Sequence, residues 1–170
     1  MKYYAGIGSR ETPVEICNQM TAIASELEKI GYVLRSGGAY GADKAFSDGV
    51  ENKSNKQIFL PWRGFNAIIS EFESPTETAL EIAEKFHPRW SGLKSGAKNL
   101  HGRNTHIILG PNCDSVVDFV VAYTSDGRFS GGTGQGLRIA QHHNIKIYNL
   151  YYQRDLDDIL SFIDRERLEV

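Results

Sequence analysis

The sequence predicts an α/β fold: one three-layer domain built on a mostly parallel sheet. Apolar runs of strand length alternate with helical patterns along almost the whole chain. Each of three glycine-rich turns, at 6–10, 36–43 and 130–136, follows a strand-like run and precedes a helical segment. The β-branched apolar run at 116–124 is typical of a central strand that is buried on both faces. Strands and helices that alternate in this way favour a parallel sheet with helices on both sides.

The first part of the chain reads as strand, helix, strand, helix, strand. Thr12 and Glu15 form a capping-box pattern with Pro13 at the first helical position, so the first helix is expected to begin there. Gly31 ends its apolar helical spacing. The strands are expected at 3–7, 32–35 and 57–60, and the helices at 12–30 and 41–50.

The rest of the chain keeps the alternation after a less regular middle part. No internal repeat or long linker interrupts it, so residues 1–170 are expected to form a single domain. Helices are expected at 65–72, 74–86, 96–109, 133–143 and 154–165, and strands at 116–124 and 145–150.

The composition limits the classes of function. A formal net charge of −2 gives no global electrostatic reason to bind long nucleic acids. Cys17 and Cys113 are too few and too far apart for a disulfide framework or a zinc site, and no other spacing predicts a metal site. No apolar stretch approaches the ~20 residues of a membrane span. A cytoplasmic protein with no membrane partner is therefore expected.

The glycine-rich turns predict a site for a phosphorylated ligand. A glycine loop between a strand and a helix exposes backbone N–H groups, and these stabilise an anion. Loops at the carboxyl ends of parallel strands converge on one crevice, so the three turns are expected to share one site. Arginine side chains beside them are expected to bind phosphate oxygens directly. The candidate ligand-binding residues are Gly8, Ser9, Arg10, Arg35, Ser36, Gly37, Gly38, Ala39, Asp43, Arg103, Asn104, Gly131, Gly132, Thr133, Gly134 and Gln135.

The same motifs resemble a known group of proteins. Gly8-Ser9-Arg10, the run 35–43 and Arg103-Asn104 resemble, in order and spacing, the Rossmann-like core of the DNA-processing protein DprA (Smf). The third glycine loop is similar to that of LOG, or lysine-decarboxylase-like, proteins, and both groups belong to the SLOG superfamily. Stand-alone forms of this kind occur in bacteria and phages. The resemblance implies a Rossmann-like domain, a nucleotide or nucleic-acid phosphate site at the glycine loops, and self-association into a homo-oligomer.

One departure from the LOG pattern bears on catalysis. LOG-type phosphoribohydrolases use a glutamate of the third loop together with an arginine. In this chain Arg138 stands at the position of that glutamate, and Arg103 stands in for the arginine. A guanidinium cannot replace a carboxylate that activates water. The resemblance therefore implies a phosphate site without implying this reaction.

Three functions remain open, in the following order. The first is capture of a small nucleotide, which the protein senses or sequesters. The second is hydrolysis of a glycosidic or phosphoester bond in a nucleotide, with Asp43, Asp126 or Glu11 as the catalytic carboxylate. The third is DprA-like binding of single-stranded DNA, with bases stacked on Tyr40, Trp62 and Trp90. No cofactor is predicted, although a bound nucleotide can bring Mg²⁺ with it.

Overall fold

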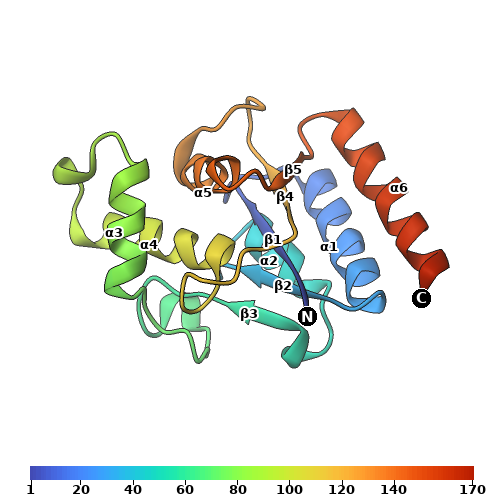
Figure 1. Cartoon of the computed structure of the whole chain (residues 1–170), viewed down its shortest axis with the longest axis horizontal. Coiled ribbons are helices and arrows are strands. Elements are labelled where there is room, and N and C mark those ends of the chain that lie inside the picture. The colour runs from blue at the N-terminus through green and yellow to red at the C-terminus, as the bar shows by residue number, and fades with distance from the viewer.

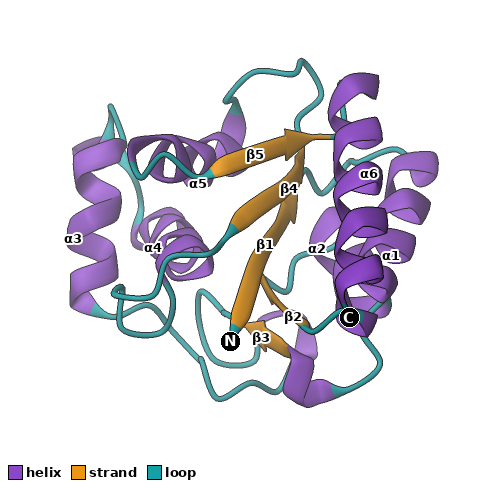
Figure 2. Cartoon of the chain, turned by 45° about the vertical axis from the view of Figure 1, so that its right-hand side comes forward, coloured by secondary structure: helices purple, strands orange, loops and turns teal.

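Five parallel strands form one sheet at the centre of the computed structural model, which describes residues 1–170 (Figures 1 and 2). The strand order is β3-β2-β1-β4-β5, and every neighbouring pair is parallel. The strands are β1 (Lys2–Gly8), β2 (Tyr32–Ser36), β3 (Lys56–Ile58), β4 (Phe119–Tyr123) and β5 (Lys146–Asn149). The helices are α1 (Val14–Lys29), α2 (Ala42–Asp48), α3 (Glu77–Phe86), α4 (Ser95–Leu109), α5 (Gly131–His142) and α6 (Gln153–Glu169). The predicted α/β fold is confirmed, with a sheet that is parallel throughout.

Helices cover both faces of the sheet (Figure 2). Successive side chains of a strand point to opposite faces, and Val120 and Val121 accordingly belong to two different cores. One core lies between the sheet and α1, α2 and α6, and it contains Leu27 and Phe46. The other lies under α4 and α5, with α3 packed against α4. The result is the three-layer, Rossmann-like arrangement that the sequence predicts.

The chain reverses its direction across the sheet between β1 and β4. From β1 it proceeds outward through β2 to β3, and it then returns to β4 on the other side of β1. The loops that follow β1, β2 and β4 therefore lie at one edge, beside the point where the order reverses. Residues of α4 connect two of these loops, because Arg103 donates to the carbonyl of Gly37 and Asn104 donates to that of Gly132. The predicted convergence of the glycine-rich loops is confirmed.

The helix expected at 65–72 does not form. A single turn of 3-10 helix covers Phe65–Ala67, and the chain then continues without helical structure to Phe72, which pairs with Phe59 beyond the end of β3. The backbone of Asn66 is left-handed, which breaks the helical path. Backbone and side-chain bonds to β3 and to the second glycine loop take the place of the helical ladder.

The capping box expected at the start of α1 is also absent. Pro13 occupies the N-cap position, and no side chain caps this end of the helix. The hydroxyl of Thr12 donates instead to the carbonyl of Ser9, at 2.6 Å. The loop after β1 therefore uses the hydroxyl that the sequence pattern assigns to the helix. None of the helices is long and apolar enough to span a membrane.

Candidate functional site

The loop after β1 is fixed by one carbonyl group. The carbonyl oxygen of Ser9 accepts hydrogen bonds from the backbone and the hydroxyl of Thr12 and from the N–H of Ala42. The last of these bonds joins the first glycine loop to the start of α2. Gly41 fits beneath this connection, because a Cβ there would lie 2.5 Å from the carbonyl oxygen of Arg10. The side chain of Arg10 itself is exposed and is held by no ion pair, so it is free to meet an anion.

The loop after β2 is built around two buried, oppositely charged side chains. Asp43 accepts a hydrogen bond from the N–H of Ala39 at 3.1 Å, and Arg103 donates to the carbonyl of Gly37. Gly37 lies between them, since a Cβ there would come within 2.5 Å of Arg103 Nη1 and 2.8 Å of Asp43 Oδ2. Burial raises the pKa of Asp43, and the charge of Arg103 and the loop N–H groups act against this rise. Both side chains therefore serve to hold the shape of the loop.

Arg103 is a buried cation with fewer hydrogen-bond acceptors around it than its guanidinium N–H groups can use. Only 6% of the residue is exposed, and its Nε has no hydrogen-bond partner. Its guanidinium carbon lies 5.7 Å from the ring centre of Phe65. Burial lowers the pKa of Arg103, but an arginine remains charged in proteins. It therefore adds a fixed positive charge beneath the second glycine loop.

The loop after β4 leaves the start of α5 open. Ser130 is the N-cap residue but makes no capping bond, and the N–H of Gly134 is the first to bond within the helix, to the carbonyl of Ser130. The N–H groups of the three preceding residues, Gly131 to Thr133, are thus left for an outside acceptor. A Cβ on Gly131 would meet nothing within 4 Å. Backbone donors and the positive end of the helix dipole combine here in a surface that a phosphate can approach.

Asp126 shapes this loop from outside. Its Oδ1 accepts from the N–H of Arg128 at 2.9 Å and from the hydroxyl of Ser130 at 3.0 Å. These bonds lower the pKa of its carboxyl group. The aspartate is therefore an ionised turn residue and not a group with a raised pKa of the kind that general acids require.

Two residues of α5 face away from the open start of the helix. Gln135 is fully buried and donates to the carbonyl of Ala83, while Arg138 donates to the carbonyl of Phe86 and to the side chain of Gln135. Ala83 and Phe86 belong to the last turn of α3, whose carbonyls have no partner within the helix. Arg138, at the position of the LOG glutamate, thus joins two helices together.

Arg35 lies apart from the other candidate residues. Its guanidinium donates to the carbonyl and hydroxyl of Ser115 and to Gln57, and it stacks on Tyr3 with 4.0 Å between the guanidinium carbon and the ring centre. The residue is only 1% exposed. Each of the three guanidinium nitrogens of Arg35 thus has an internal partner, two of them on the loop that enters β4.

Exposed aromatic side chains gather at the same edge of the sheet as the glycine loops. Each lies two to four residues beyond the last residue of a strand: Tyr40 after β2, Trp62 after β3, and Tyr151 and Tyr152 after β5. The exposed fractions are 60%, 42%, 48% and 46%, and no other aromatic residue is among the large exposed hydrophobic side chains. Trp90, in contrast, packs with His87 and Lys98 beside α4.

The Tyr151–Tyr152 pair is absent from the residues that the sequence singles out. Tyr152 donates from its hydroxyl to the carbonyl of Gly127, and the two rings pack edge to face, 5.0 Å apart. The pair is thereby attached to the loop that leads into α5. The signal in the sequence is an aromatic pair directly after the last strand, at the edge where the glycine loops are expected.

No protein-family model matches this chain, and no curated protein sequence matches it. Among solved structures, it is similar to DNA processing protein A from Helicobacter pylori, whose single-stranded DNA binding mode has been studied. The similarity has a TM-score of 0.57 and 21% sequence identity, and it covers 87% of this chain. The chain spans 64% of that neighbour's length. At this identity the comparison establishes the fold alone. This chain has a DprA-like, Rossmann-type fold.

Proposed function

We propose that this protein binds single-stranded DNA along the carboxyl edge of its sheet. The bases stack on the exposed aromatic side chains, and the phosphates lie against the glycine loops and Arg10. The proposal concerns binding without turnover. The sequence ranks single-stranded DNA binding third among the expected functions. The arrangement of the exposed aromatic residues now favours it over the other two.

The row of aromatic residues carries the proposal. Aromatic rings accept any base, and stacking contributes ~1–3 kcal/mol per base in proteins that bind single strands without sequence preference. The ends of β3 and β5 are separated by four strand spacings, or ~19 Å at about 4.8 Å each. This span exceeds the length of several stacked bases at about 3.4 Å each. A row of this length is suited to a strand and much larger than one mononucleotide needs.

Phosphate contacts are available between the aromatic positions. The unbonded N–H groups at the start of α5 and the free guanidinium of Arg10 lie at the ends of β4 and β1, the two strands between the aromatic positions. Arg103 adds a positive charge beneath the second glycine loop. These local charges supply the attraction that a net charge of −2 does not provide over the whole chain. The single-stranded DNA binding of the H. pylori neighbour agrees with this assignment.

The two other functions have weaker support. Asp43 has a raised pKa but is buried beneath Gly37 and Ala39, and Asp126 has a lowered pKa, so neither is a convincing catalytic carboxylate. Capture of a small nucleotide was expected from the three glycine loops together with Arg10, Arg35 and Arg103, and two of these arginines, Arg35 and Arg103, make internal contacts. Self-association and a cytoplasmic location stay predictions.

Fluorescence anisotropy with labelled oligothymidylate of about 20 nucleotides tests the proposal. We expect binding that weakens steeply with salt and that an equal length of duplex does not match. Tyr40→Ala and Tyr151→Ala should each weaken binding about 5- to 150-fold, which corresponds to ~1–3 kcal/mol per stacked base. Arg10→Ala should weaken binding and also reduce the salt dependence.

Leu160→Ala provides the control, because Leu160 is 44% exposed but lies on α6. It should bind DNA like the unmodified protein. Unchanged affinity in the tyrosine variants would remove the aromatic row from the binding site. Equal affinity for single strands and duplex would contradict the proposal as a whole.

A further inference from the structure

A cavity of about 450 Å³ opens beside the second glycine loop, between α2 and the segment 66–72. Gly38, Ala39 and Tyr40 line it on the side of the loop. Its volume falls within the ~300–1,000 Å³ of small-molecule pockets. Neither Arg10 nor the start of α5 borders it. The cavity therefore lies next to the proposed strand path and is distinct from the phosphate contacts on that path.

The walls of the cavity suit a flat, largely apolar body with a polar edge. Ile58, Ile68 and Phe72 form apolar surface, and Tyr40 stands at the rim. The side-chain amide of Asn66 donates to the carbonyl of Gly38 at 3.0 Å, which leaves its oxygen for another partner. Aromatic stacking together with a side-chain amide at the edge is the chemistry that recognises an unpaired nucleobase.

The wall made by residues 66–72 is held rigidly. Asn66 and Ala67 have φ angles of 52° and 59°, in the left-handed region, which asparagine tolerates but which is costly for an alanine. The bond from Asn66 to Gly38 and the bond from the hydroxyl of Ser70 to the carbonyl of Ile58 maintain this conformation. Strained backbone of this kind persists where its surroundings over-determine it. The cavity is thus preformed.

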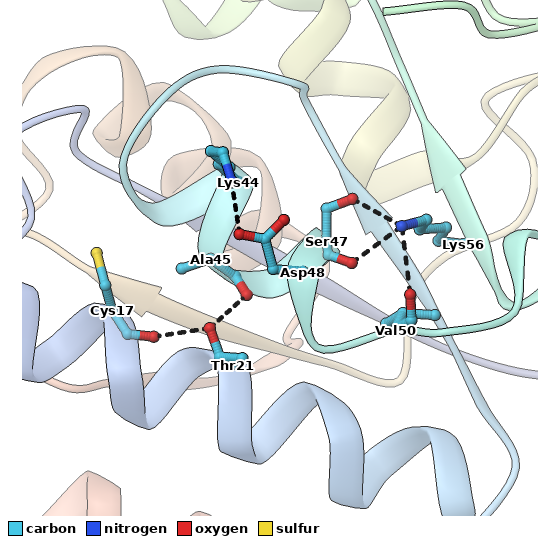
Figure 3. Close-up of polar contacts among 8 residues, drawn as sticks. All are labelled: Cys17, Thr21, Lys44, Ala45, Ser47, Asp48, Val50 and Lys56. Carbon is cyan, nitrogen blue, oxygen red and sulfur yellow. Dashed lines mark hydrogen bonds and ion pairs between the residues drawn. The ribbon is translucent and has the colours of Figure 1, made fainter.

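Charged side chains of both signs line the other side of the cavity: Lys44, Lys53 and Lys56, and the carboxylates of Asp43, Asp48 and Glu71. Asp43 faces Arg103 and Asp48 pairs with Lys44, so Glu71 is the one carboxylate left to oppose Lys53 and Lys56. Lys56 donates to the carbonyl and hydroxyl of Ser47 and to the carbonyl of Val50, all neutral acceptors, at 2.9, 3.0 and 3.3 Å (Figure 3). Its charge therefore has no carboxylate partner. Lys44 pairs with Asp48 at 2.7 Å, but both side chains are more than half exposed, so this ion pair is weak. An anion at the rim gains from both lysines.

We propose that the cavity binds one nucleotide unit. Its base lies between Tyr40 and the isoleucine wall with an edge on Asn66, and its phosphate points toward Lys44 and Lys56. This nucleotide unit is part of the bound DNA strand, so the inference rests on the proposed function. A free mononucleotide has the same chemistry and is distinguished by experiment. In a bound strand, the base at this position turns out of the stack and enters the cavity.

Amide NMR spectra of the ¹⁵N-labelled protein test the inference directly. The ligands are the four deoxynucleoside monophosphates, thymidine, inorganic phosphate and oligothymidylate. We expect at least one monophosphate to shift the amides of Gly38, Asn66 and Ser70, and to bind at least tenfold more tightly than inorganic phosphate or thymidine. Ile68→Trp, which fills the cavity, should weaken that binding at least tenfold. Leu160→Trp on α6 should leave it unchanged.

The outcomes separate this inference from the proposed function. If monophosphates leave the cavity amides unshifted while oligothymidylate binds and depends on Tyr151, the cavity assignment is wrong and strand binding remains. If monophosphates bind in the cavity but the oligonucleotide does not bind, the cavity stands as a site for a free nucleotide and strand binding is refuted. If neither binds, both are overturned. The mapping on the unmodified protein decides these cases even if Ile68→Trp fails to fold.

Discussion

The second and third glycine loops share one sequence pattern but differ in how much space surrounds their first glycines. In the loop after β2, side chains fill the space around Gly37, and a Cβ there would collide with Arg103 and Asp43. In the loop after β4, Gly134 is confined too, since a Cβ there would lie 2.4 Å from the carbonyl carbon of Phe129. Gly131, whose φ is +63°, has nothing within 4 Å of a Cβ, and Gly132 has only the amide of Asn104, at 4.0 Å. The loop after β2 needs Gly37 because of the side chains that are packed around it. The loop after β4 has room beside Gly131 and Gly132 for a ligand from outside.

The two loops also differ in how their backbone N–H groups are hydrogen-bonded. Asp43 accepts the N–H of Ala39 and thereby satisfies the second loop from within, whereas α5 begins without any side-chain cap. An uncapped start of a helix costs ~0.5–2 kcal/mol relative to a good cap. This cost is acceptable where a ligand provides the missing acceptor. The comparison indicates that the second loop is stabilised from within, and it agrees with the ligand contact that we propose for the third.

Removal of the buried carboxylate should have the largest effect. Asp43→Ala leaves the N–H of Ala39 unpaired and removes the opposite charge that faces Arg103. We expect a loss of ~3 kcal/mol in the free energy of unfolding, because a buried donor is left without its acceptor and Arg103 loses the charge that faces it. Urea unfolding measures it. Asp126→Ala in the third loop is the matched control and should change the urea midpoint far less. Similar shifts for both variants would remove the distinction between the loops.

Alanine substitutions at two glycines contrast the loops more closely. Gly41→Ala should cost ~1–3 kcal/mol, because φ is +76° and the added Cβ would collide with the backbone of Arg10. Gly132→Ala should stay within about ±0.5 kcal/mol, as surface changes usually do. Thermal unfolding of the two variants side by side provides the measurement. A larger loss at Gly132 than at Gly41 would contradict the assignment.

A smaller effect is expected from pH. His106 is buried and neutral: its Nδ1–H donates to the carbonyl of Gly110, and its Nε2 accepts the N–H of Thr76. Burial lowers the pKa of His106, and burial with neighbouring positive charge lowers the pKa of His101 to about 4. The folded state then binds fewer protons than the unfolded state below the ordinary pKa of 6.5. The contribution of the two neutral histidines to the free energy of unfolding is therefore complete above pH 6.5 and is lost as the pH falls toward 4.

Asp43 in the second loop works in the opposite direction. Because burial raises its pKa, the folded state takes up a proton before the unfolded state does, and acid relieves part of its burial cost. Urea midpoints at pH 7 and pH 5 measure the net effect. We expect a lower midpoint at pH 5 and a smaller decrease in the His106→Gln variant. An equal decrease in that variant would show that His106 does not contribute.

The long periodic elements were predictable from local sequence. The positions of α1, α4 and α5 were predicted to within two residues at most ends, since apolar spacing and glycine stops are properties of neighbouring residues. The segment 65–72 was misread as a helix. Its conformation depends on contacts with Gly38, Ile58 and Phe59, which lie far away in the sequence. The aromatic pair Tyr151–Tyr152 was missed for a related reason, because its place beside Gly127 depends on the packing of β4 against β5.

The sequence by itself determined the α/β alternation and the convergence of three glycine loops, because a parallel sheet brings the carboxyl ends of its strands to one edge. Only the tertiary structure decided which polar side chains remain free. Arg35, Arg103 and Asp43 resemble ligand-binding residues in sequence, yet each finds partners inside the protein, while Arg10 does not. A residue type specifies which bonds a side chain can make. Packing decides whether the protein or a ligand makes them.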